Sequence, residues 1–283
     1  MLAIVGGLGA ALVFATVTLC NSRSSRMIGP AQLLAWVMLI GLLITAPIAA
    51  FQGAPDGLDA EAASWMAVAG VGNVVGLLLA YSALRVGKVG IVAPLVSTQG
   101  AIAAVIALIA GEALKPGVGP LLAAIAVGIF VAGVTPSGNG AEAREPARGV
   151  LLAVAAAIAI GWSLYAIGKV SVSLPVVWAL LPSRVLGFAI VTLPLAVGAG
   201  LRMTREALPL VLVAGGFEVL GFALFAFGAR HGIAISAVLS SQFAAIAAIA
   251  AYMLFGERLS RLQTTGVGII IVGVGVLSGI QAS

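Results

Sequence analysis

The chain has 283 residues, of which 62% are hydrophobic and only 8% are charged, and its formal net charge is +5. A soluble domain of this length cannot bury so much apolar surface, so lipid must be the solvent for much of it. A bilayer interior admits only helices and closed barrels, because backbone groups find no water there. The apolar runs are about 18–23 residues long and lack the alternation of strands. The composition therefore predicts an all-α integral membrane protein.

Several function classes are excluded by what the sequence lacks. Cys20 is the single cysteine, which rules out an internal disulfide and a multi-cysteine metal site. No His, Asp and Glu residues have the spacing of metal ligands, and His231 is the single histidine. No Ser/His/Asp set and no phosphate-binding loop is present, so we expect no enzyme activity, no cofactor and no ATP-driven transport by this chain alone. The basic residues are spread over short loops, which indicates membrane orientation and no nucleic-acid partner.

In chain order, the apolar runs predict ten membrane-spanning helices. They lie at about 2–20, 32–50, 65–84, 89–110, 118–134, 149–168, 176–197, 208–228, 233–255 and 262–280. The first run has no basic segment before it, so we interpret it as a retained helix and not as a cleaved signal. The longest polar break, TPSGNGAEAREPAR at 135–148, divides the chain into a first half at 1–134 and a second half at 149–283.

The two halves share an internal duplication. Residues 85–114 read RVGKVGIVAPLVSTQGAIAAVIALIAGEAL, and residues 230–259 read RHGIAISAVLSSQFAAIAAIAAYMLFGERL. They align without a gap at an offset of 145 residues, and each places an Arg-x-Gly turn before a long apolar run and Gly-Glu-x-Leu after it. A period of half the chain indicates one duplication. Because five spans are an odd number, the second half enters from the opposite side, so we expect inverted-topology repeats with a site near the midplane.

The distribution of basic residues predicts the orientation. Ten lie in alternate loops, at Arg23, Arg26, Arg85, Lys88, Arg144, Arg148, Arg202, Arg205, Arg258 and Arg261. The opposite loops hold only Lys115, Lys169 and Arg230, and the loop between the second and third spans carries Asp56, Asp59 and Glu61. The positive-inside rule therefore places the first set in the cytoplasm and both termini outside.

Two motifs carry a family resemblance. The last repeat ends in GERLSRLQTTGVGIIIVGVGVL, the first half has the weaker counterpart APLVSTQGAIAAVIALIAGEALKPG, and the third span ends in Ala-Leu-Arg at 83–85. With ten spans in two halves, the chain resembles the drug/metabolite transporter superfamily, specifically its EamA-like ten-helix branch. The resemblance implies a basket of spans 1–4 and 6–9 around a central cavity, with spans 5 and 10 packed outside. It also implies cytoplasmic termini, in conflict with the charge count, so the orientation stays open.

Glu218 is the first candidate for a functional residue. It lies near the middle of the eighth span, where an acid is costly, so a functional role is the default interpretation. Asn73 is its counterpart in the first half, so both halves place a polar group at one depth. Glu218 shares a helix face with Gly215, Phe222 and Phe225. We interpret it as a coupling acid for protons or a partner for a substrate ammonium, with a structural ion pair as the alternative.

Arg184 is the second candidate, and it lies well inside the seventh span after Pro182. An arginine at this depth needs water or a partner. Its planar fork suits a substrate carboxylate, which makes a substrate clamp one interpretation. A salt bridge to Glu218 that holds the bundle together is the other, and the two can alternate during a transport cycle.

Further candidates come from the sixth, fourth and ninth spans. Trp162 and Tyr165 share a face with Lys169, and we expect the two aromatic side chains either to line a cavity or to pack in the core. The polar clusters are expected either to line the pore or to serve close helix packing. These clusters are Ser97, Thr98 and Gln99 in the fourth span and Ser240, Ser241 and Gln242 in the ninth, with Tyr81 and Tyr252 as additional candidates.

The charged residues that match between the two halves at the span ends are interpreted as structural. Glu112 and Glu257 are expected to cap a following helix or to pair with Arg230 or Arg85, and a gating role is the alternative. The glycines of the last span permit close packing.

Together these features predict a secondary transporter of small organic solutes, working by alternating access in an inner (plasma) membrane. Glu218 and Arg184 together favour an amino-acid-like zwitterion. One alternative is an exporter of organic cations or drugs that exchanges protons at Glu218, and an alternative of another class is a non-transporting membrane scaffold. The expected partners are the solute, the lipid bilayer and, where Glu218 couples, protons; monomer and homodimer both stay open.

Overall fold

A computed structural model describes residues 1–87, 89–133, 145–198 and 200–247, with positions 250, 261–262, 265–266, 268–269, 272–273, 276 and 280. Every regular element among these residues is a helix, which confirms the all-α prediction. Six helices of the described part are long and apolar enough to cross a membrane, and three shorter apolar helices accompany them. The count of ten spans in inverted repeats stays a prediction.

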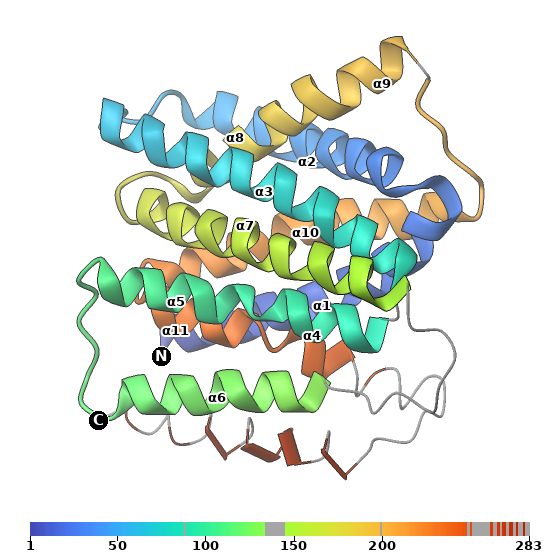
Figure 1. Ribbon diagram of the computed structural model, residues 1–283. Coiled ribbons are helices and arrows are strands. Elements are labelled where there is room, and N and C mark those ends of the chain that lie inside the picture. The colour runs from blue at the N-terminus through green and yellow to red at the C-terminus, as the bar shows by residue number, and fades with distance from the viewer. Residues whose placement is uncertain are drawn as a thin grey trace.

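The helices follow the predicted order and are shown in Figure 1. Their bounds are α1 Leu2–Ile28, α2 Pro30–Gln52, α3 Ala60–Val86, α4 Val89–Ser97, α5 Gln99–Ile109, α6 Val118–Gly133, α7 Glu145–Ser173, α8 Val176–Gly187, the π-helical turn η1 Phe188–Thr192, α9 Leu193–Val197, α10 Ala207–Ala229 and α11 Ile233–Ser240. The predicted first and third spans are each extended by a turn or more, because polar residues continue the helix beyond its apolar part.

The fourth predicted span is not one helix, because α4 and α5 meet at a break at Thr98. The Thr98 hydroxyl donates to the carbonyl of Leu95 at 2.7 Å, and the Thr98 amide is directed to the same carbonyl at 3.3 Å. The ninth span breaks in the same way after α11, where the Ser240 hydroxyl donates to Ala237 O at 2.9 Å. Side chains that bond to nearby backbone compete with the helix ladder. The polar clusters of the sequence therefore interrupt both spans at corresponding depths.

The helices of the two halves pack in reciprocal pairs. The two most extensive contacts run between α3 and α7 and between α1 and α10, and α2 packs on α8 as a third pair across the halves. Adding 145 to the residue numbers of α1 and α3 gives nearly the ranges of α7 and α10. Exchanging the two halves therefore turns the contact of α3 with α7 into the contact of α10 with α1. The third pair joins an element to its own counterpart. Such reciprocity is what a two-fold relation between two copies produces.

Helix α6 lies at one edge of the bundle (Figure 1). A Cβ atom on Gly128 would lie 2.9 Å from Cγ2 of Ile269, and one on Gly273 would lie 2.6 Å from Cγ1 of Ile125. Gly128 and Gly273 are counterparts in the repeat, and each lets the other segment approach closely. The fifth span and the described positions of the tenth therefore pack on each other, while the first four spans face the second half.

Candidate functional site

A cleft lies between the two halves and contains about 560 Å³ of empty space, including the space at its mouth. Four residues come from α1, four from α3, three from α4 and the rest from α5, α7, α10 and the ninth span. The lining residues are Phe14, Val17, Thr18, Asn21, Leu77, Ala80, Tyr81, Leu84, Val92, Ala93, Val96, Gln99, Ile160, Glu218, Phe222 and Phe243. A mostly apolar cleft with a few convergent polar groups is typical of a small-molecule site.

Glu218 is the one charged residue among the described residues that line the cleft. Its side chain is almost fully buried, with 1% of its surface exposed. The Tyr81 hydroxyl donates a hydrogen bond to Glu218 Oε2 at 2.7 Å, so α3 of the first half holds an acid of α10 in the second. Asn21 of α1 lies beside the Tyr81 hydroxyl and also lines the cleft. Three helices thus position the carboxylate.

Arg184 lies behind Glu218 and does not line the cleft. Its Nη1 atom is 3.6 Å from Glu218 Oε1, and its side chain is buried, with 1% of its surface exposed. The guanidinium also lies 5.7 Å from the centre of the Phe222 ring and 3.7 Å from Met38 Sδ. The α2 helix approaches it at Gly41, where a Cβ atom would meet Arg184 Cδ at 2.7 Å. The geometry therefore matches the structural salt bridge, and the carboxylate clamp stays a prediction without support from these contacts.

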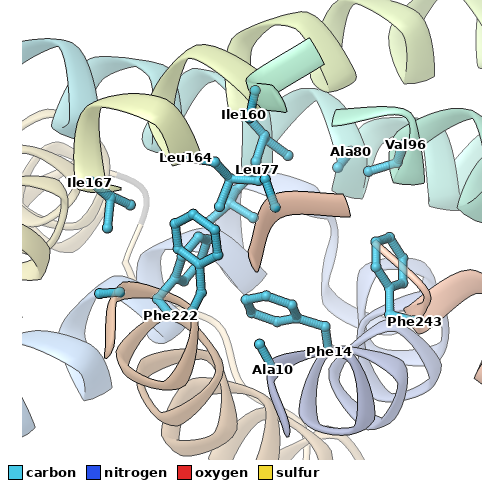
Figure 2. Close-up of a cluster of buried hydrophobic side chains, with 14 of the residues drawn as sticks. Ala10, Phe14, Leu77, Ala80, Val96, Ile160, Leu164, Ile167, Phe222 and Phe243 are labelled. Carbon is cyan, nitrogen blue, oxygen red and sulfur yellow. The ribbon is translucent and has the colours of Figure 1, made fainter. Parts of the chain in front are cut away.

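Aromatic rings form one wall of the cleft, as Figure 2 shows. The Phe14 and Phe222 rings meet edge to face with their centres 5.0 Å apart, and the Phe14 and Phe243 rings do so at 6.5 Å. This geometry is favourable for aromatic pairs. Sequence reasoning missed Phe14 and Phe243, which come from helices distant in the chain; only Phe222 carried a signal, because it lies one turn after Glu218.

Three buried oxygen atoms of the lining residues have no hydrogen-bond partner. They are Asn21 Oδ1, Gln99 Oε1 and Glu218 Oε1. Buried polar atoms are normally paired, so acceptors left free in a cleft indicate a place for a donor. Sequence reasoning identified Gln99 and Glu218 but missed Asn21, which lies near the end of α1 where a polar residue carries little signal.

Two predicted aromatic candidates lie away from the cleft. Trp162 is 46% exposed on the outer surface of the bundle, so the prediction that it lines the cavity was wrong. Ile160 and Leu164 of α7 are buried. Trp162 lies two positions from each of them along the helix, which places it on the opposite face. Tyr165 is buried, but it packs edge to face on Trp65, with the ring centres 5.4 Å apart, and does not line the cleft.

The remaining polar candidates are dispersed. Asn73 is buried one turn from Leu77, and neither atom of its amide has a partner. Ser97 and Ser241 line a second, smaller cavity together with Thr98, beside the two helix breaks. Gln242 is buried, and its Nε2 atom has no partner. Only Gln99 of the two polar clusters reaches the main cleft.

The predicted structural turns cap helices across the bundle. Arg230 donates from Nη2 to the carbonyl of Leu174 at 2.7 Å and from Nε to that of Ser171, at the end of α7. Glu112 accepts from the amide of Ala234 at 3.2 Å, at the start of α11. Partial burial raises the pKa of Glu112, although the amides of α11 oppose this effect. Arg85 is exposed.

Two of the predicted residues lie outside the part of the chain that the structure describes. They are Glu257, the counterpart of Glu112, and Tyr252.

The cleft is closed at one end. Its lining residues Asn21, Leu84 and Val92 lie near the end of α1, the end of α3 and the start of α4, so the cleft extends toward that side. At the other side α1 and α10 touch, and a Cβ atom on Gly6 would lie 2.6 Å from Gly228 Cα. Backbones in such close contact leave no path for a solute.

Comparison with known proteins agrees with this architecture. Residues 1–134 match the model of the EamA-like transporter family. A solved crystal structure superposes with a TM-score of 0.76 at 18% sequence identity, covering 98% of this chain and 96% of that one, which shows a shared fold. No curated protein matches the chain in sequence.

Together, the helices and the family match define a multi-pass membrane protein of the transporter class. The predicted resemblance to the EamA-like transporters is confirmed, and this family is one of transporters and not of enzymes.

Proposed function

We propose that the chain is a secondary transporter that moves small organic solutes by alternating access. The observation that carries this proposal is a nearly fully buried carboxylate, Glu218, at the floor of a cleft between the two halves. Substrate sites of secondary transporters lie near the midplane between repeats. In this proposal residues 1–134 and 149–283 are inverted five-helix repeats joined by the connector at 135–148, and they rock about the cleft.

The direction of opening follows from the geometry of the cleft and the charge pattern. The cleft extends toward the loops after α1 and α3, which carry Arg23, Arg26 and Arg85. The positive-inside rule assigns these loops to the cytoplasm of an inner or plasma membrane. The state described is then inward-facing, and separation of α1 from α10 at Gly6 and Gly228 would open the outer side.

Glu218 is the proposed coupling group. A carboxylate that both a proton and a substrate can neutralise allows exchange of one for the other, and Glu218 is the acid among the described residues that line the cleft. The amino-acid-like substrate predicted first needs Arg184 in the cleft as well, whereas Arg184 lies behind Glu218. These contacts favour the alternative, an exporter of organic cations.

A non-transporting scaffold is the alternative from another class. A scaffold should have every buried polar group paired and no cleft, because unpaired groups cost stability without serving a purpose. The cleft itself and the oxygens of Asn21 and Gln99, which have no hydrogen-bond partner, argue for transport.

The test uses proteoliposomes with a pH-sensitive dye inside and a panel of amino acids and permanently charged amines, which do not cross lipid unaided. We expect substrate-dependent proton movement with the wild type and its loss with Glu218→Gln. Glu112→Gln is the matched control, because it removes a helix-capping acid outside the cleft, and should retain activity. Normal pH-dependent turnover by a folded Glu218→Gln variant would exclude the coupling role, and absence of any protein-dependent flux would exclude transport.

A further inference from the structure

We infer that the cleft recognises a primary ammonium group on an aromatic or apolar body and discriminates against carboxylates. This inference rests on the proposed function and names the substrate class of the same cleft. Three observations carry it: the acceptor oxygens without hydrogen-bond partners, the lack of a cationic side chain among the described lining residues, and the aromatic wall.

The acceptors match an ammonium group. Asn21 Oδ1 and Gln99 Oε1 belong to lining residues, are buried and have no hydrogen-bond partner, and Glu218 Oε1 has no hydrogen bond but lies 3.6 Å from Arg184 Nη1. A primary ammonium has three N–H donors and no acceptor. The Tyr81 hydroxyl donates to Glu218 and lies beside Asn21, so the side chains of Asn21 and Glu218 are near each other. Glu218 provides the negative charge, which the ammonium would share with Arg184.

The cleft offers no cationic side chain to a carboxylate. The Tyr81 hydroxyl already donates to Glu218, and the Thr18 hydroxyl donates to the Phe14 carbonyl at 2.8 Å. No lysine or arginine is among the described residues that line the cleft. A carboxylate buried without a cationic partner is costly, and here Glu218 would also repel it. A zwitterionic amino acid would therefore bind more weakly than the amine that lacks its carboxylate.

The aromatic wall accommodates the rest of the ligand. The Phe14 ring lies between those of Phe222 and Phe243, and Leu77, Val96 and Ile160 are also part of the cleft (Figure 2). Ring faces attract cations and flat apolar groups. Phe222 lies one turn from Glu218, so a ring near Phe222 and an ammonium at Glu218 fit a molecule with a short linker between them.

Binding to purified protein in detergent at neutral pH tests the inference without any need for transport. Labelled phenethylamine is competed with phenylalanine, which adds a carboxylate, and with 2-phenylethanol, which lacks the charge. We expect each competitor to bind at least tenfold more weakly than phenethylamine. Phenylalanine binding as tightly as phenethylamine, or no saturable binding of phenethylamine, would overturn the inference.

Variants test the role of the acceptors. Asn21→Leu and Gln99→Leu should weaken phenethylamine binding threefold or more, but leave the binding of its trimethylammonium analogue almost unchanged, because that analogue has no N–H donors. Equal effects on both ligands, or no effect on either, would contradict the assignment. Glu218→Gln should weaken both. For the ring, Phe222→Leu should weaken binding, whereas Phe217→Leu is the matched control on the lipid-facing side of α10.

The two proposals fail separately. Tight binding of phenethylamine without flux in proteoliposomes would reject transport and keep the recognition. Flux of other solutes with no binding of phenethylamine would keep transport and reject the recognition.

Discussion

Glu218 is held by one partner from each half of the chain. Tyr81 of α3 donates a hydrogen bond to it, and Arg184 of α8 lies 3.6 Å from its other oxygen. Both charges are buried, and two nitrogen atoms of Arg184, Nε and Nη2, have no hydrogen-bond partner. A buried ion pair with incomplete hydrogen bonding is poor at stabilising a fold but costly to break on one side.

This arrangement predicts a strong coupling between Arg184 and Glu218. Arg184→Gln should lower the free energy of unfolding by about 3 kcal/mol, because it leaves the buried carboxylate without its counter-ion. Adding Glu218→Gln to that variant should cost much less than Glu218→Gln costs in the wild type. Thermal unfolding of the four proteins in one detergent measures the coupling. Additive effects would show that the two side chains do not depend on each other.

At the scale of the elements, glycines set how closely the helices approach. A Cβ atom on Gly6 of α1 would lie 2.6 Å from Gly228 Cα and from the Leu224 carbonyl oxygen of α10. Neither neighbour can yield without a shift of backbone. At Gly216, also on α10, a Cβ atom would meet nothing within 4 Å.

These two positions form a matched pair for substitution. Gly6→Ala should destabilise the protein by about 1–3 kcal/mol through overpacking at the helix contact. Gly216→Ala should be neutral or stabilise by up to about 1 kcal/mol, because alanine favours the helix. The midpoints of thermal unfolding in detergent give both values. If the two substitutions had the same effect, α1 and α10 would not be in close contact at Gly6.

The breaks in the fourth and ninth spans belong to the same scale. The clusters Ser97–Gln99 and Ser240–Gln242 were predicted either to line a pore or to serve packing, and they also interrupt helices. The hydroxyls of Thr98 and Ser240 each bond to a carbonyl three residues earlier. Periodicity of apolar residues does not reveal this competition, because the residues on both sides of each break remain apolar.

At the scale of the whole molecule, the reciprocal packing of α3 on α7 and of α1 on α10 places the cleft on the boundary between the halves. The charge count puts the loop between α2 and α3 outside, whereas the family resemblance implies the opposite orientation. Asp56 of this loop is exposed and therefore accessible to reagents.

Labelling of a cysteine at position 56 decides the orientation. In a Cys20→Ser background, Asp56→Cys should react with a membrane-impermeant maleimide added to intact cells, because the positive-inside rule places this loop outside. Ser22→Cys, near the C-terminal end of α1 and beside the basic loop after it, should react only after the cells are opened. The reverse pattern would assign the basic loops to the exterior, and the described cleft would then be outward-facing.

The sequence by itself determined the helical membrane fold and the resemblance to the EamA-like transporters, and it predicted the duplication, because hydropathy, run length and the offset of 145 residues are properties of the linear chain. It also identified Glu218, because an acid within an apolar helix is conspicuous in one dimension. Only the tertiary structure decided which side chains share the cleft with it. Asn21, Tyr81 and Phe14 come from helices distant in the chain, and a polar or aromatic residue in an apolar run shows no direction by itself.

The tertiary structure also separated Arg184 from the cleft and moved Trp162 to the outer surface. The rotation of a helix about its axis sets which of its residues face inward, and contacts with neighbouring helices fix that rotation. Sequence spacing places residues on one face but does not say where that face points. The sequence therefore located the charged groups in depth, and the packing decided which of them a solute can reach.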